Sequence, residues 1–182
     1  MLGRYLIVCI LALGLCVPAL AQTSTDNGLS ASLEMFYFTD SEARDLLGTG
    51  MGLNVEKKLA NDMYISLGYI KAGDELSAGS ESLEWDVSLI PIMVTKHFGQ
   101  ISQNSNAYWG VGAGFVINKL DMSYKDTEYP GDNFDESDSS TDLAWQLVGG
   151  TLLGKNILAQ AKYFSGGHEG NTGFSLNVGM KF

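Results

Sequence analysis

Apolar and polar residues alternate along most of this chain, with a period of two rather than 3.6 residues. The stretch GFSLNVGMKF at residues 173–182 shows the pattern most clearly, because every second position is apolar. Such runs, bounded by turn-forming residues, predict β-strands. Eight segments follow the pattern: residues 28–39, 46–59, 63–70, 82–98, 107–125, 141–154, 156–167 and 173–182. No segment shows the stripe of an amphipathic helix, so the pattern predicts an all-β fold.

The fourth segment changes phase at Pro91. Before the proline, the apolar side chains of Leu83 and Trp85 fall on one face, whereas Ile92 and Val94 continue on what had been the polar face. Proline cannot donate a hydrogen bond to a neighbouring strand. We therefore expect a β-bulge at this position.

The connections between the segments alternate in length. Those after the first, third, fifth and seventh segments are longer, and we expect them to be loops: DSEARD, KAGDELSAGSE, DTEYPGDNFDESDSS and GHEGNT. Those after the second, fourth and sixth are mostly shorter: AND, GQISQNSN and KN. An even number of strands with long loops at one end and short turns at the other is typical of outer-membrane barrels.

The first 21 residues have the features of a secretory signal peptide. A basic residue precedes a short apolar run, and a small-x-small cleavage site follows it. Both cysteines, Cys9 and Cys16, lie in this segment, and Leu15 is a poor fit to a lipoprotein site. Residues 22–182 are then a single domain that has no disulfide and no thiol nucleophile.

The composition narrows the class of protein further. The formal net charge is −10, which argues against a nucleic-acid partner because such a partner needs a basic surface. Hydrophobic residues make up 45% of the chain and 22 residues are glycine, yet beyond the leader no stretch is long and apolar enough for a membrane-spanning helix. A secreted β-domain and an outer-membrane barrel both remain possible.

The two faces of the strands differ in a way that favours the membrane barrel. The polar face is rich in small residues, which a narrow eight-stranded barrel needs inside: Gly48, Gly50, Gly52, Gly110, Gly112 and Gly114. The same face carries charges of both signs that could pair as a lumen network: Glu34, Glu56, Glu84, Asp86, Lys162 and Lys181. The apolar face has rings near its ends, as in an interfacial girdle: Tyr37, Trp85, Trp109, Trp145, Phe174 and Phe182.

We therefore predict a single eight-stranded antiparallel up-and-down transmembrane β-barrel with apolar side chains facing lipid. Backbone groups left unpaired in hydrocarbon are costly, so the first and last strands must pair. The fourth and fifth strands are long enough to project beyond the membrane. A soluble lipocalin-like binder is the alternative, and it would place Trp109 and Trp145 inside the barrel.

Two stretches resemble a known family. The residues Phe174, Leu176, Val178, Met180 and Phe182 resemble the C-terminal signal read by the outer-membrane assembly machinery of Gram-negative bacteria, and AYWGVGAGFVI resembles a strand of small barrels of the OmpA transmembrane, OmpX and OmpW kind. The resemblance implies an eight-stranded barrel in the cell outer membrane, in contact with membrane lipid, lipopolysaccharide and the assembly machinery. We expect a monomer. The family implies no single activity, because its fold hosts many functions.

Several motifs could carry chemistry, and each has a simpler interpretation. The acidic segment 125–142 could bind divalent cations, but it lacks EF-hand spacing and is more typical of a solvated loop. Ser165, His168 and Glu169 resemble a hydrolytic trio only in composition. His97 is expected at the interface near the short-turn end. We therefore expect no catalytic residue, metal or cofactor.

The leading hypothesis is a non-enzymatic outer-membrane barrel with acidic external loops and a structural or surface-interaction role. Two further alternatives are a small port for hydrophobic compounds with a lateral opening near Pro91, and a lipid-modifying enzyme.

Overall fold

A computed structural model describes residues 28–99, 107–153, 156–166 and 171–182 of the chain. The predicted signal peptide lies outside these residues. The eight strands are β1 (Leu29–Phe38), β2 (Thr49–Lys58), β3 (Met63–Ala78), β4 (Glu81–Phe98), β5 (Ala107–Asp126), β6 (Phe134–Leu153), β7 (Ile157–Ser165) and β8 (Thr172–Lys181). All eight segments predicted from the alternation are therefore confirmed as strands, although several of their ends differ.

The strands form a closed barrel in which each strand pairs antiparallel with its neighbours in sequence. Closure comes from the pairing of β1 with β8, which runs from Ser30 opposite Lys181 to Phe38 opposite Gly173. The backbone N–H of Phe182 continues this seam by donating to the carbonyl of Leu29 at 2.7 Å. The prediction of an eight-stranded up-and-down barrel is confirmed.

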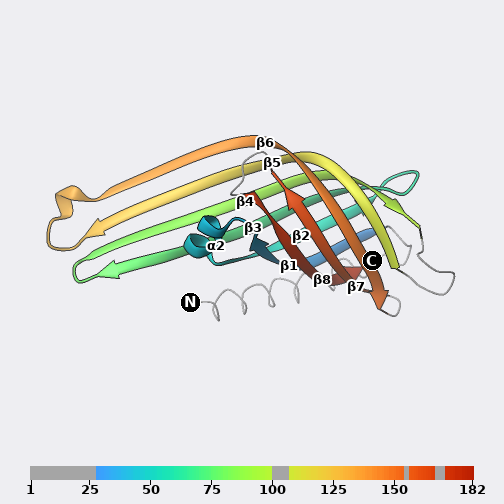
Figure 1. Cartoon of the computed structure of the whole chain (residues 1–182), viewed down its shortest axis with the longest axis horizontal. Helices are drawn as coiled ribbons and strands as arrows, with labels where there is room; N and C mark the ends of the chain where they lie inside the picture. The colour runs from blue at the N-terminus through green and yellow to red at the C-terminus, as the bar shows by residue number, and fades with distance from the viewer. Residues whose placement is uncertain (1–27, 100–106, 154–155, 167–170) are drawn as a thin grey trace.

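Four strands continue far beyond the barrel. The pairing of β2 with β3 stops at Lys71, and that of β6 with β7 stops at Trp145. Beyond these points only β3, β4, β5 and β6 remain paired with one another. We call this part the extension, comprising residues 72–78, 81–87, 115–126 and 134–144; it forms the long arching sheet on the left of Figure 1.

The extension corrects the predicted loops. Residues 71–81 and 126–140 were expected to be loops, yet most of them belong to the strands of the extension. The turn between β3 and β4 needs only Gly79 and Ser80, and Gly79 has a φ of 67°, which favours glycine. The segment between β5 and β6 contains a short 3₁₀ turn, η1 (Pro130–Asp132).

A short helix lies at the mouth of the barrel. Helix α2 (Ser41–Leu47) occupies most of the first expected loop, and the carboxylate of Asp40 caps it by accepting from the N–H of Ala43 at 2.8 Å. Gly48 ends the helix with a φ of 64°, so it is a helix cap rather than one of the predicted inward strand glycines. Among the described residues, no helix has the length and apolar character needed to cross a membrane.

Pro91 causes no bulge. The register of β4 against β5 is unbroken from Glu81 to Phe98, and its register against β3 is the same on both sides of the proline. The ring of Pro91 is buried in the barrel beside Gly68, where an added Cβ would lie 2.8 Å from the proline Cγ. The predicted bulge is therefore wrong, because a glycine on the adjacent strand leaves room for the ring.

The change of phase at Pro91 has a different cause. In the barrel, Ile92 and Val94 are exposed on the outer wall. In the extension, Trp85 and Val87 are directly paired with residues of the inner side, and Val87 packs against the buried core. Apolar side chains thus face outward in one part of β4 and inward in the other, as expected if the solvent around the strand changes from lipid to water.

The interior has two layers. Towards the extension, apolar side chains form a cluster that fills the barrel: Phe36, Phe38, Ile70, Ala72, Leu89, Met93, Val116, Ala144 and Phe164. Towards the other end, the buried residues are mainly polar: Ser32, Glu34, Asn54, Glu56, Ser66, Thr95, His97, Gln146, Gln160, Lys162, Ser175 and Asn177. The apolar cluster was not predicted, and it means that the lumen is not polar along its whole length.

Candidate functional site

The outer wall of the barrel is apolar and exposed. Trp109 is 48% exposed and Trp145 is 46% exposed, so the two tryptophans are not inside the barrel. This contradicts the lipocalin-like alternative, which requires them in the interior. The orientation predicted for the barrel strands is therefore confirmed.

Aromatic rings gather on the wall at two levels. Near the extension, the ring of Tyr163 lies 5.3 Å from that of Trp145 and 5.0 Å from that of Phe174. At the opposite end, Phe98 and Trp109 stack with ring centroids 4.3 Å apart. Two aromatic levels separated by a band of aliphatic side chains are the arrangement of a membrane barrel with its two interfaces.

Only some residues of the predicted lumen network lie inside the barrel. Glu34, Glu56 and Lys162 are buried in the polar layer, at 5%, 4% and 5% exposure. Lys181 is half-buried at the end opposite the extension, where it lines a pocket with Glu56.

Glu84 and Asp86 do not belong to the lumen. Both lie in the extension, on the face that continues the outer wall, and Asp86 forms an ion pair with Lys71 at 2.8 Å. The prediction that they belong to the lumen network is wrong because it depends on a bulge at Pro91, which the structure does not have. The prediction that Trp85 belongs to the outer girdle is wrong for the same reason. Trp85 lies on the inner side, where its Nε1 donates to the carbonyl of Leu46 in α2 at 2.8 Å.

A pocket of about 350 Å³ lies at the end opposite the extension. His97, expected at the interface, is only 8% exposed and is stacked between Tyr64 and Tyr108, with ring centroids 4.0 Å and 4.5 Å apart. Its Nε2 lies 3.9 Å from a carboxylate oxygen of Glu56, and Gln160 donates to the hydroxyl of Tyr108 at 2.5 Å. The alternation gave no signal for this stack, because its three members come from three different strands.

The remaining candidate chemistry does not form a site in the described residues. No group of three His, Cys, Asp or Glu side chains among them is placed to hold a metal ion. Part of the acidic segment 125–142 is strand β6 rather than loop. The hydroxyl of Ser165 contacts that of Thr172 at 3.2 Å, whereas His168 and Glu169 lie outside the described residues, so the hydrolytic trio stays untested.

The residues of the predicted assembly signal lie along β8 on the outer wall. Phe174 and Leu176 are each 55% exposed, Val178 is 61% exposed and Met180 is 38% exposed. Phe182 follows the strand and is half-buried. The set therefore lies on the lipid-facing side of the seam, and its role in assembly stays a prediction.

These features define the fold of a small outer-membrane β-barrel. Two solved structures of this fold are similar to the chain: the N-terminal β-barrel domain of OprF from Pseudomonas aeruginosa, with a TM-score of 0.54, and the attachment invasion locus protein Ail from Yersinia pestis, with a TM-score of 0.53. Each shares 13% identity and is matched over 85% of this chain, and the match covers 96% of the OprF domain and 99% of Ail. The Ail structure holds the heparin analogue sucrose octasulfate.

No protein-family model matches the sequence, and no curated protein matches it. The resemblance to small outer-membrane barrels is therefore confirmed at the level of the fold, which by itself does not determine an activity.

Proposed function

We propose that the chain is an integral protein of the cell outer membrane that presents the extension on the outside of the cell. The observation that carries this proposal is the exposed apolar wall with its two aromatic levels, which water would disfavour and lipid would accept. The strands at the extension end project well beyond the barrel, and a longer projecting end is typical of the external side.

The barrel supplies an anchor, and the proposed role is structural or in surface interaction rather than catalysis. The apolar cluster around Phe36, Met93 and Val116 fills the barrel below the extension, where each of the three is at most 1% exposed. Such packing supports a closed barrel rather than a channel. The same proposal includes three further features. Residues 1–21 are a cleaved signal peptide, the barrel contacts lipopolysaccharide, and Phe182 is recognised by the assembly machinery.

The test combines fractionation with gel mobility. We expect the protein in the outer-membrane fraction, and we expect unboiled samples to migrate differently from boiled ones because the folded barrel resists denaturation. Recovery as a soluble periplasmic protein whose mobility does not change on heating would refute the proposal.

A further inference from the structure

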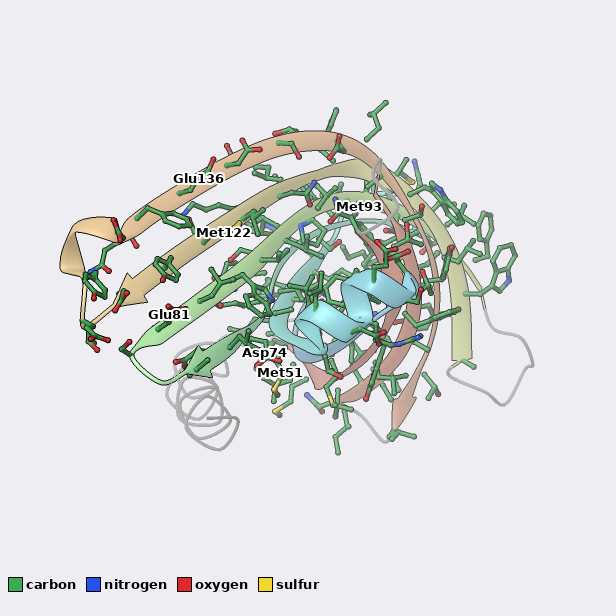
Figure 2. All side chains as sticks on the ribbon, turned by 60° about the vertical axis from the view of Figure 1, so that its left-hand side comes forward. Met51, Asp74, Glu81, Met93, Met122 and Glu136 are labelled. Carbon is green, nitrogen blue, oxygen red and sulfur yellow. The ribbon has the colours of Figure 1, made fainter. Side chains whose placement is uncertain are left out.

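The inner face of the extension continues the lumen side of the barrel above its mouth. Residues directly opposite one another on antiparallel strands point to the same side of a sheet. The pairings of the four strands give three continuous rows on this face: Leu76, Leu83, Tyr124 and Phe134; Asp74, Trp85, Met122 and Glu136; Ala72, Val87, Leu120 and Asp138. Figure 2 shows Asp74, Met122 and Glu136 on the strands that arch over α2.

This inner face carries exposed apolar side chains on three of its four strands. Leu76 is 65% exposed, Phe134 is 47% exposed and Leu120 is 40% exposed, although all three lie in the part of the chain proposed to be in water. The rings of Tyr124 and Phe134 stack at 5.6 Å and hold the far row in place. Apolar groups clustered on a face outside the membrane indicate an interaction surface.

Charge is sorted between the two faces of the extension. The exposed charges in the three inner rows are Asp74, Glu136 and Asp138, which are all acidic. The lysines at the base of the sheet lie on the opposite face, where Lys71 pairs with Asp86 at 2.8 Å and Lys119 pairs with Asp121 at 2.7 Å. No strand residue of the described inner face is basic, so a partner there meets apolar side chains framed by carboxylates.

The base of the inner face already binds a helical segment of the same chain. Trp85 donates to the carbonyl of Leu46, and Ala43 and Leu47 pack against the buried core together with Val87. Helix α2 therefore lies at the base of the face beside Trp85 and Val87, whereas Leu76, Leu120 and Phe134 stay exposed.

We propose that the inner face of the extension binds a cationic amphipathic polypeptide segment. Its apolar side chains would pack on Leu76, Leu120 and Phe134, and its lysine or arginine side chains would pair with Glu136 and Asp138. A second copy of this chain fits poorly, because its formal net charge is −10. The inference rests on the proposed function in that the extension must be exposed to water.

The experiment uses the full mature chain refolded into micelles of a non-ionic detergent, with heat-modifiable migration checked first. The sequence has three tryptophans, and the substitutions Trp109→Phe and Trp145→Phe leave only Trp85. The fluorescence emission of Trp85 then reports on the inner face. The probe is a ten-residue peptide of alternating lysine and leucine. The control peptides alternate glutamate with leucine and lysine with serine.

Two matched pairs of substitutions separate local recognition from bulk charge. Glu136→Gln with Asp138→Asn removes two charges from the inner face, and Glu84→Gln with Asp135→Asn removes two from the outer face of the same sheet. We expect the inner pair to raise the Kd of the lysine–leucine peptide about tenfold, which corresponds to two exposed ion pairs of about 0.7 kcal/mol each, and the outer pair to change it less than twofold.

Each outcome decides the proposal. Binding of the lysine–leucine peptide but neither control, with the asymmetry between the two pairs, supports it. Equal weakening by both pairs, no change in Trp85 emission, or a concentration-dependent dimer that buries the face would overturn it. A chain that never shows heat-modifiable migration would instead contradict the proposed membrane barrel.

Discussion

Phe36 offers a direct test of the apolar layer that fills the barrel. Its side chain has 0% exposure, and its ring makes edge contacts with Phe38 at 5.0 Å and Phe164 at 6.3 Å. The ring also lies over Gly173 on β8, where an added Cβ would be 2.5 Å from Phe36 Cζ. Phe36→Ala would leave a cavity that neither lipid nor backbone can fill.

The expected cost follows from this packing. Truncation of a buried phenylalanine costs about 3–5 kcal/mol, of which part is loss of transfer energy and part is the cavity left behind. Phe174 is a matched control, because it is a phenylalanine of similar ring contact that is 55% exposed on the outer wall. Detergent can occupy the space left by Phe174→Ala, so only the transfer term of about 2 kcal/mol remains. We expect Phe36→Ala to cost about 2 kcal/mol more than Phe174→Ala.

The assay is urea unfolding of each variant in the same micelles, followed by the heat-modifiable band. With a slope of about 2 kcal/mol per molar urea, the midpoint should fall by about 2 M for Phe36→Ala and about 1 M for Phe174→Ala. Equal shifts would show that the barrel interior near Phe36 collapses or holds water, and the inference of a sealed apolar layer would then fail.

Three further predictions follow from the barrel. Lys162→Met should cost about 3 kcal/mol in urea unfolding because it removes the buried positive charge that stabilises the buried carboxylate of Glu56, and adding Glu56→Gln should restore most of that loss. Gly68→Ala should destabilise the barrel by about 1–2 kcal/mol through contact with the ring of Pro91, and Pro91→Ala should relieve this in a double-mutant cycle; additive costs would show that the two do not touch. Deleting Phe182 should lower the amount assembled into the outer membrane of cells while leaving refolding into micelles nearly unchanged, and an equal loss in both would assign it to barrel stability instead.

The sequence predicted the barrel well because its signal is local. Alternation gives the strands directly, and the exposed residues on β8 and the tryptophans Trp109 and Trp145 lie on the predicted side. Closure then follows from the cost of unpaired backbone in lipid.

The extension was missed because polar strands and polar loops look alike in a single sequence. Residues such as those from Phe134 to Asp142 have few apolar side chains, and their strand structure comes from pairing with β5 rather than from their own preference. The misplacement of Glu84 and Asp86 has the same origin, since alternation reports which face is apolar but not which solvent surrounds the strand. The stack of Tyr64, His97 and Tyr108 depends on register between strands, which composition does not encode.

The outer edges of the extension are β3 and β6. Neither has a strand partner there among the described residues, since the pairing of β3 with β2 stops at Lys71 and the pairing of β6 with β7 stops at Trp145. Unpaired edge strands can pair with the edge strand of a neighbouring molecule, and crowding in the plane of a membrane would increase this risk of aggregation. On β6 the bare edge carries Asp135, Glu136, Asp138 and Asp142 without a single lysine or arginine. Like-charge repulsion along that edge should keep adjacent molecules apart, so that the same acidity that shapes recognition also guards against aggregation.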